Sequence, residues 1–358
     1  MADLVDFVAL SLLPCWCWLD AADGLRAGEP PADALRRICE ARWSDRPEKP
    51  ATLRTQAGAA LGRGAAHRLT PVAWSDAAYP IALTTIPDPP AVLWTRGQTT
   101  ALNAPAVAIV GSRAASPYAL EVAERLAHDL SRAGLVVVSG LARGVDSAAH
   151  KGALSANGAT LAVLGSGADV IYPKEHEPLV REIERGGAVV SELAPGAPPL
   201  PQFFPLRNRI ISGLSRAVVV IEASLKSGSL ITARAALEQG RDVLAVPGNV
   251  LSGRNRGNHA LLRDGAKIVE SADDILEELG MLDRPREAPK GDGLPFPAAF
   301  PDPVLASLTP GEPSDLDAIA ERSGLPPAKL LPRLFELELR GSIARVGGGR
   351  FVRIDRTC

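Results

Sequence analysis

The sequence has few cysteines and no long apolar run, and both absences narrow the class of protein. Four cysteines in 358 residues do not make a disulfide framework, and the spacing of Cys15 and Cys17 fits neither a redox nor a zinc pair. No apolar stretch approaches the roughly 18 residues of a membrane-spanning helix. The first residues include Asp3 and Asp6 and no basic segment, unlike a signal peptide. We therefore expect a cytoplasmic protein with no membrane partner.

An excess of charge of one sign is also missing. The chain has 39 lysines and arginines against 41 aspartates and glutamates, a net charge of -2. This balance argues against a uniformly basic coat that would bind nucleic acid. It leaves room for a local basic patch, because salt confines the effect of surface charges to about 10 Å.

The common phosphate-binding and catalytic signatures are absent as well. There is no G-x-x-x-x-G-K-[ST] loop, and no G-x-G-x-x-G fingerprint follows the apolar run that ends at Gly111. Arg113 stands where a second glycine would let a pyrophosphate approach the backbone. His150 and His176 lack a neighbouring nucleophile and carboxylate, and no residues have metal-ligand spacing. We expect no catalytic residue, no metal and no cofactor.

The residues that are present divide the chain into three domains and a linker. Residues 1–70 have helical periodicity, which predicts a small helical domain. Residues 71–280 alternate apolar runs with helix-like segments, which predicts an α/β fold with an extended Rossmann-like parallel sheet. Residues 281–302 are rich in Pro and Gly, as in a linker. Residues 303–358 contain two helical stretches and an alternating hairpin, the pattern of a winged-helix domain.

Seven apolar runs are expected as strands of the central sheet, and the loops after them share one chemistry. The runs lie at 107–110, 135–139, 160–165, 187–191, 217–222, 242–248 and 266–270. Because ligands bind at the carboxyl ends of parallel strands, we expect the loops that follow to meet at one edge. They contain glycines, hydroxyls and helix N-termini that offer free N–H groups to an anion.

Cations recur around these loops, and no acidic residue falls between Glu192 and Glu222. The basic residues are Arg113, Arg143, Lys174, Arg207, Arg209 and Lys226. Phe203 and Phe204 precede the RNR stretch, and single-stranded nucleic acid needs cations for its backbone and π-faces for its bases. Simpler interpretations stay open: a lone turn arginine is often only solvated, Asn208 can cap a helix, and either phenylalanine can belong to the core.

Together these stretches resemble one known family. GSR, SGLARGVDSAAHKGAL, GSGADVIYPKEH, FPLRNRIISGLS and EASLKSGSLITARAALEQGRDVLAVPG look like the motifs of the DNA-processing protein A (DprA/Smf) family, almost continuously over residues 74–280. The linker and the C-terminal region are similar to that family's winged-helix module. Residues 1–70 loosely resemble its sterile-alpha-motif-like (SAM-like) module.

The resemblance implies a protein that is not an enzyme and that binds single-stranded DNA through its Rossmann-like domain. Members of the family protect incoming DNA in natural transformation, form homodimers and help to load the recombinase RecA. By motif, the DNA-binding cations and amide are Arg113, Arg143, Lys174, Arg207, Asn208, Arg209 and Arg241, to which we add Gly111, Ser112 and Phe203. The expected dimer and recombinase contacts are Leu261, Leu262 and Ile268. We expect Arg113→Ala or Arg207→Ala to weaken DNA binding with the fold intact.

An enzyme is the alternative hypothesis. The lysine-decarboxylase-like phosphoribohydrolases, which hydrolyse nucleotides on a related core, carry P-G-G-x-G-T-x-x-E with a catalytic glutamate. The corresponding stretch here, EASLKSGSLITARAAL, has Ala233 and no glutamate before Glu238. A dinucleotide-dependent oxidoreductase is disfavoured by the missing fingerprint.

The presumed recognition helix of the C-terminal domain, PPAKLLPRLFELELRG, has a mixed charge. It carries Lys329, Arg333 and Arg340, but also Glu336 and Glu338. Acids on a helix that reads a DNA groove repel the phosphates. We therefore favour a protein-contact or regulatory role, or weak duplex binding, over sequence-specific recognition.

Overall fold

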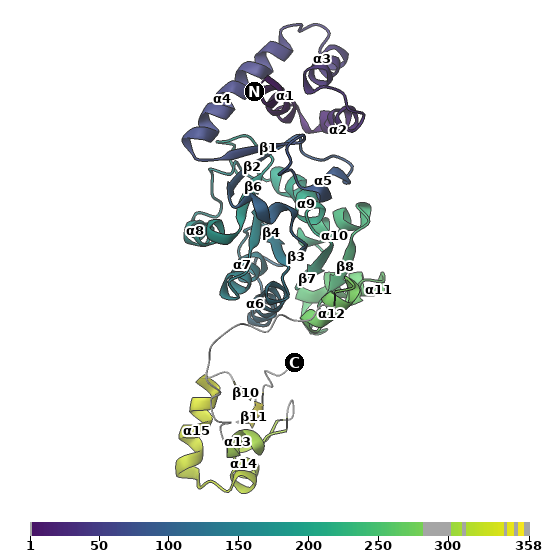
Figure 1. Cartoon of the computed structure of the whole chain (residues 1–358). Helices are drawn as coiled ribbons and strands as arrows, with labels where there is room; N and C mark the ends of the chain where they lie inside the picture. The colour runs from purple at the N-terminus through teal and green to yellow at the C-terminus, as the bar shows by residue number, and fades with distance from the viewer. Residues whose placement is uncertain (1, 282–301, 310–312, 340–341, 347–349, 354–358) are drawn as a thin grey trace. The chain divides into compact units, whose positions relative to one another are not determined.

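The computed structural model describes residues 2–281, 302–309, 313–339, 342–346 and 350–353. The chain divides into two compact units, Met1–Pro285 and Arg286–Cys358 (Figure 1). The predicted linker lies outside the described residues except at its two ends.

The first unit begins with the predicted helical region. Its elements are α1 (Ala2–Ser11), η1 (Cys15–Cys17), α2 (Trp18–Arg26), α3 (Pro31–Arg42) and α4 (Lys49–Ala66). Leu35 and Ile38 of α3 are buried in one core with Val92 and Trp94 of the neighbouring sheet. Gly64 of α4 lets that helix also approach the sheet, because a Cβ there would lie 2.6 Å from the Trp94 ring. The predicted boundary after residue 70 thus coincides with the start of the sheet, but the core crosses it.

A nine-stranded sheet forms the centre of this unit. Its strands are β1 (Thr70–Ala73), β2 (Val92–Gly97), β3 (Ala106–Val110), β4 (Val136–Ser139), β5 (Thr160–Val163), β6 (Ala188–Ser191), β7 (Ala217–Val220), β8 (Asp242–Ala245) and β9 (Lys267–Ile268). The strand order is β1-β2-β6-β5-β4-β3-β7-β8-β9. Neighbours from β6 to β9 are parallel, whereas β2 is antiparallel to β6 and β1 to β2. All seven expected strands are present.

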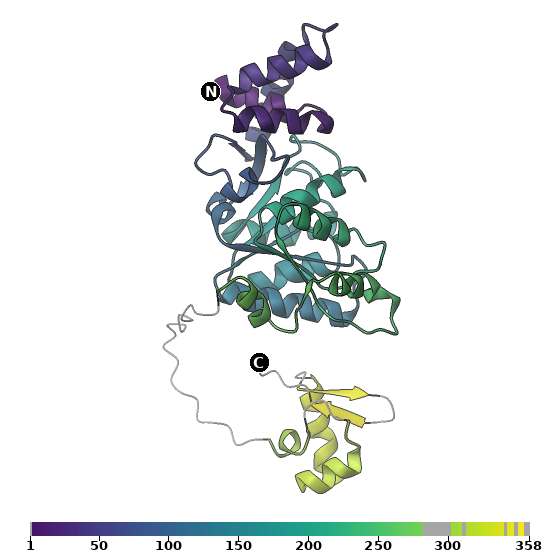
Figure 2. The ribbon, with the colours of Figure 1, turned by 90° about the vertical axis from the view of Figure 1, so that its right-hand side faces the viewer.

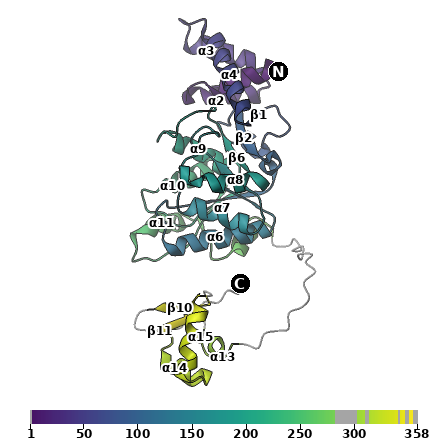
Figure 3. The same ribbon diagram turned by 90° about the vertical axis from the view of Figure 1, so that its left-hand side faces the viewer.

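Helices cover both faces of the sheet (Figures 2 and 3). One face holds α6 (Pro117–Arg132), α7 (Val145–Ser155), α8 (Glu177–Gly186) and α12 (Ala272–Glu278), and the other holds α9 (Phe203–Gly213) and α10 (Ser229–Glu238). Alternation along β3 shows the division: Val107 and Ile109 pack under the first layer, Ala108 and Val110 under the second. Because both faces are covered, the strands read as continuous apolar runs. The predicted Rossmann-like class is confirmed.

The chain reverses direction across the sheet at β3. It builds β4, β5 and β6 on one side of β3 and then returns through α9 to place β7 on the other side. At such a switch point the loops after the two central strands leave in opposite directions and open a crevice. Shorter elements complete the unit: α5 (Ile81–Thr84), η2 (Thr99–Asn103), η3 (Lys174–His176), η4 (Gly253–Asn255) and α11 (Arg256–Arg263).

The second unit has the predicted helix-turn-helix with a wing. It contains α13 (Pro303–Ala306), α14 (Leu316–Ser323), α15 (Pro327–Leu339) and the antiparallel pair β10 (Ile343–Val346) and β11 (Arg350–Arg353). Ile319, Leu334 and Phe351 lie in its small core. Gly324 ends α14 in the left-handed conformation, at a φ of 66°, which glycine adopts without steric cost. The predicted winged-helix class is confirmed.

Among the described residues, no single helix is both long and apolar enough to cross a membrane. One bent pair, Asp3–Ser11 with Cys15–Arg26, meets the length and composition criteria only when its two helices are counted together across a 119° bend.

Candidate nucleic-acid interface

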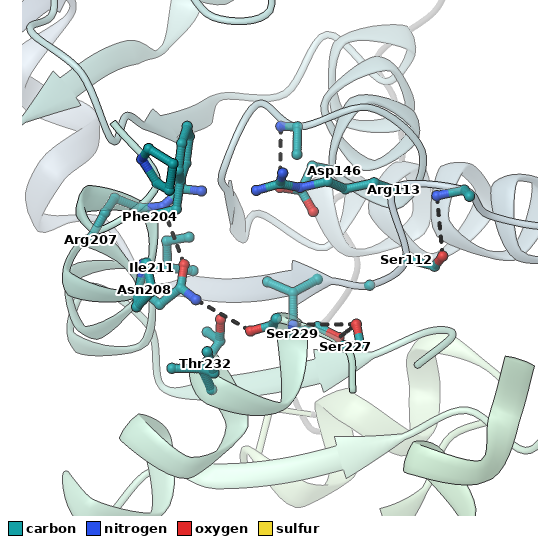
Figure 4. A pocket seen from close by; sticks show the side chains of 18 of the residues that line it. Ser112, Arg113, Asp146, Phe204, Arg207, Asn208, Ile211, Ser227, Ser229 and Thr232 are labelled. Atoms are coloured by element: carbon teal, nitrogen blue, oxygen red, sulfur yellow. Dashed lines mark hydrogen bonds between the residues drawn. The ribbon is translucent and has the colours of Figure 1, made fainter. Parts of the chain in front are cut away.

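A cavity of about 630 Å³ opens at the switch point between β3 and β7 (Figure 4). Five segments distant in sequence line it: the turn after β3, the loop into α7 and its start, the loop around Tyr172, the stretch from Pro199 into α9, and the loop into α10 with the start of that helix. Its polar lining residues are Ser112, Arg113, Asp146, Tyr172, Arg207, Asn208, Ser224, Ser227, Ser229 and Thr232. The expectation that strand-end loops converge is therefore confirmed for these segments.

Arg207 lies deep in this cavity, with only 6% of its surface exposed. Its guanidinium donates to the carbonyl oxygens of Gly140, at 2.7 Å, and Val163. Gly140 leaves room for the group, since a Cβ there would lie 2.5 Å from an Arg207 nitrogen. Burial lowers the pKa of Arg207 to about 10, with Asp146 opposing this shift and Arg113 adding to it. The side chain remains a cation at neutral pH.

The buried acid Asp146 lines the same cavity as Arg207 and feels its charge. It accepts hydrogen bonds from the backbone amides of Gly140 and Ala142 at 3.2 and 3.3 Å. Burial raises its pKa, while the charge of Arg207 counteracts that rise. Arg207 and Asp146 thus influence each other through their charges without a direct ion pair between them, and the bonds of Arg207 to two main-chain carbonyls make it part of the protein's structure as well as of the cavity wall.

The mouth of the cavity combines a cation with two aromatic rings. Arg113 is exposed, and its guanidinium carbon lies 5.2 Å from the centroid of the Phe204 ring. The Tyr172 ring lies 5.7 Å from that of Phe204, and Tyr172 is 44% exposed. Phe203, the phenylalanine selected from the sequence, instead lines a small separate cavity with Trp18. The aromatic rings that line the main cavity are therefore those of Phe204 and Tyr172, and not that of Phe203.

Hydroxyl groups and a helix N-terminus form the opposite wall. Helix α10 begins at Ser229 without a side-chain cap from Gly228, and the hydroxyl of Ser227, in the loop before it, lies 2.7 Å from that of Ser229. Asn208 donates to the carbonyl oxygen of Gly228 at 3.3 Å, so it joins α9 to this loop and also borders the cavity. An uncapped helix N-terminus favours an anion.

The N-terminus of α6, where a Rossmann fold would hold a pyrophosphate, is already occupied. The Glu222 carboxylate accepts hydrogen bonds from the Ser116 amide at 3.2 Å and the Ser116 hydroxyl at 2.6 Å. Arg254 lies 3.9 Å from the same carboxylate. Gly111 serves packing, because a Cβ there would meet Val145 at 2.6 Å. The anion at the N-terminus of this helix is therefore the protein's own Glu222 side chain, whereas DNA binding by the GSR turn itself stays a prediction.

Two of the expected cations lie away from the cavity. Arg209 is buried on another side of α9, where it pairs with Asp88 at 3.0 Å and with Glu192 and lies 5.0 Å above the Trp18 ring. Although burial acts to lower the pKa of Arg209, the two carboxylates outweigh it and raise the pKa. Arg241 precedes β8 at the amino end of the strand and donates to Ala82. Arg209 and Arg241 therefore do not line the cavity, and DNA binding by either stays a prediction.

Arg143 and Lys174 lie beside the cavity rather than in it. Arg143 is exposed and forms an ion pair with Glu175. Lys174 is exposed in η3, two residues from Tyr172. Of the expected partner contacts, Leu261 and Leu262 of α11 are half-buried, and Ile268 is 56% exposed on the edge strand β9. Binding by any of these residues remains a prediction.

The geometry offers little for nucleotide hydrolysis. The first turn of α10, where the phosphoribohydrolase signature would place its glutamate, contains no acidic residue. Glu238 lies at the far end of that helix, near Arg234. Within the described part of the chain, no three His, Cys, Asp or Glu side chains gather as they would around a metal ion.

Comparison with known proteins gives the family. The model of the DNA recombination-mediator protein A family matches residues 70–280, and that of the DprA winged helix domain matches residues 289–349. The chain is 43% identical to Protein Smf of Escherichia coli over 298 residues, 82% of this chain and 79% of that protein. It is 48% identical to the DNA processing protein DprA of Streptococcus pneumoniae over 203 residues, 57% of this chain and 72% of that one.

Solved structures agree with this assignment. The X-ray structure of DprA from S. pneumoniae superposes with a TM-score of 0.67 at 39% identity, covering 76% of this chain and 95% of that one. A Helicobacter pylori DprA structure, described by its single-stranded DNA binding mode, gives 0.54 at 31% identity over 60% and 97%. This chain, with its switch-point cavity and winged-helix unit, therefore belongs to the DNA recombination-mediator protein A family, also called DprA or Smf.

Proposed function

We propose that this protein binds single-stranded DNA at the switch-point cavity and does not act as an enzyme. The observation that carries the proposal is the mouth of the cavity, where Arg113, Phe204 and Tyr172 lie together above the buried cation Arg207. Aromatic faces can stack on any base, and cations hold the phosphates between them. The relative from H. pylori, whose structure is described by its binding of single-stranded DNA, supports the same ligand.

Each wall of the cavity has a role in this proposal. A phosphate lies between Arg113 and the uncapped N-terminus of α10, where a helix dipole and a cation both favour negative charge. A base stacks on Phe204 or Tyr172. Arg207 is too enclosed to follow a flexible strand, so it supplies a fixed positive field from below.

A gel-shift comparison tests this function. Single-stranded and double-stranded DNA of equal length are titrated at two salt concentrations, with wild type, Arg113→Ala and the control Arg181→Ala. Arg181 is exposed on α8, away from the cavity. We expect preference for the single strand, a steep loss of affinity with salt, and weakening by Arg113→Ala alone. No preference for single strands, or equal binding by all three proteins, would reject the site.

The enzymatic alternative has a direct assay. Nucleoside monophosphates are incubated with the protein, and release of free base is followed by chromatography. The absence of an acid from the first turn of α10 leads us to expect none. Turnover that disappears in Asp146→Asn would instead establish the hydrolase, because Asp146 is the carboxylate that lines the cavity among the described residues.

We also infer a biological setting from the family: protection of incoming DNA in natural transformation, loading of the recombinase RecA, and homodimerisation, in the cytoplasm. Ile268 supports an interface, since it is a large exposed apolar residue on an edge strand. Ile268→Arg should shift the mass measured by light scattering from dimer to monomer. Strand-exchange assays with RecA would then show whether loading depends on the same surface. A monomeric wild type would refute the dimer.

The winged-helix unit fits protein contact better than groove reading. Leu331 and Phe335 of α15 are 52% and 63% exposed and lie four residues apart, hence on one side of the helix. Arg333 is engaged by Asp302 and Glu336 and is not available as a free phosphate contact. Duplex DNA binding should therefore be unchanged in Arg333→Ala. A large loss of duplex affinity would restore the DNA-reading interpretation.

A further inference from the structure

Two tryptophans lie together on the surface of the N-terminal helices. Trp16 of η1 and Trp43, the residue after α3, have ring centroids 5.3 Å apart at an interplanar angle of 42°. Trp16 is 54% exposed, whereas Trp94 in the core below is fully buried. Tryptophan is seldom left this exposed, because its large apolar surface gains from burial. The core is complete without Trp16, so the ring is available to a ligand.

Cations flank both rings. The guanidinium carbon of Arg42 lies 5.6 Å from the Trp16 centroid, and the Lys49 ammonium lies 5.4 Å from that of Trp43. Arg42 also pairs with Asp20 at 2.7 Å, while Lys49 has no ion pair within the described residues. Residues 36 to 54 contain six basic and three acidic side chains. The exposed aromatic surface is therefore set in a locally positive one.

The neighbour of this pair, Trp18, lies against the helix that lines the switch-point cavity. Trp18, two residues after Trp16, lines a small cavity with Phe203 and Arg207 at the start of α9. Phe204, the next residue, lines the main cavity. All of these residues belong to one compact unit, so their spacing is fixed by the fold. Helix α9, which lines the cavity, lies on the side of the sheet toward α2 of the N-terminal helices (Figure 1).

We propose that Trp16, with Arg42 and Lys49 beside it, forms a second single-stranded DNA contact on which a base of the emerging strand stacks. This inference rests on the proposed function of the cavity. An exposed ring with cations at its side is the combination that binds single strands without reading their sequence. A purely apolar protein partner would have to desolvate the cations, whereas a phosphate backbone neutralises them.

The test is the dependence of affinity on DNA length. Fluorescence anisotropy is measured with oligo(dT) of about 4 to about 16 nucleotides, the span that single-strand binding modules occupy. Trp16→Ala should bind the shortest strands like wild type and lose about 5- to 100-fold in affinity for the longest, the contribution of one stacked base. Trp16→Tyr should retain much of the affinity. Leu19→Ala, which truncates another exposed residue (51%) on the same helices, should change nothing.

The possible results distinguish a failure of the Trp16 contact from a failure of the proposed function. If wild type binds no single-stranded DNA, the proposed function and this contact both fail. If wild type binds and Trp16→Ala follows it at every length, the contact is overturned and the function stands. If Trp16→Ala leaves binding unchanged but alters self-association in light scattering, the patch is a protein interface and the proposal is wrong. Equal thermal melting of the variants confirms that each is folded.

Discussion

Replacing either of two arginines of one cavity by alanine should lower stability to very different extents. Arg113→Ala removes an exposed cation from above the Phe204 ring, and exposed substitutions of this kind change the free energy of unfolding by at most about 0.5 kcal/mol. Arg207→Ala removes a buried cation that donates to two main-chain carbonyls, and it leaves the Asp146 carboxylate without its opposite charge. A buried polar group that is left unsatisfied typically costs about 1–3 kcal/mol, and two carbonyls lose this donor in Arg207→Ala.

That loss is large against the 5–15 kcal/mol or so that a folded domain has in total. The initial expectation that both variants keep their fold is therefore retained for Arg113 only. Urea unfolding followed by circular dichroism measures the difference. For Arg113→Ala we expect a wild-type midpoint and a DNA-binding salt slope that is smaller by about 0.7, the contribution of one phosphate contact on a single strand. For Arg207→Ala we expect a much lower midpoint, so its loss of DNA binding does not by itself identify a contact. The reasoning is refuted if Arg207→Ala unfolds within about 1 kcal/mol of wild type.

Three further predictions concern residues outside the cavity. Glu222→Ala should lower the free energy of unfolding by about 1.5–3 kcal/mol, and inorganic phosphate should then raise the Tm of the variant more than that of wild type; equal shifts would contradict an occupied helix N-terminus. Burial lowers the pKa of His150 from 6.5 to about 3. The neutral ring therefore contributes its full stability above pH 6.5, and the free energy of unfolding falls as the pH falls, by about 2 kcal/mol at pH 5. His150→Leu should flatten this part of the profile of unfolding free energy against pH. Burial raises the pKa of the Cys17 thiol to about 11, so at pH 8 about one molecule in 1,000 has the thiolate; iodoacetamide should label exposed Cys15 first, and equal labelling by peptide mass spectrometry would exclude this burial.

The sheet could be predicted because its strands are buried on both faces. Runs such as VAIV and AVVV are continuous and apolar, and that pattern is specific for a covered parallel strand. The antiparallel strands β1 and β2 gave no such signal. Their sequences, TPVA and VLWTRG, mix polar and apolar residues, and their place in the sheet depends on pairing with β6.

Part of the predicted site lies outside the cavity for reasons that helical geometry explains. Arg207 and Arg209 are two positions apart, hence about 200° apart around α9, so a single cavity can receive only one of them. Phe203 and Phe204 are about 100° apart, and the neighbour of the selected ring is the one that lines the cavity. Arg241 comes before its strand rather than after it, which already places it at the amino edge.

Other features depend on contacts that no local pattern reveals. Glu222 is 106 positions from Ser116, and its carboxylate replaces the ligand that the fold would otherwise bind there. The absence of a Cβ at Gly140 matters because the guanidinium of Arg207, 67 positions later in the chain, packs against it. Such contacts become visible once the strand order is known.

The packing of Trp94 against Gly64 limits how this chain can be divided. Sequence comparison separates the helices from the sheet near residue 70, but the two share one interior. A fragment beginning there would leave Val92 and the whole Trp94 indole facing water, at the edge of a sheet that is then also uncovered. The N-terminal helices thus cover part of the sheet and share its core, and they do not form a separable domain. In evolution, exchanging or losing them would require a repacked β2, whereas the second unit has an interior of its own and can be exchanged as a cassette.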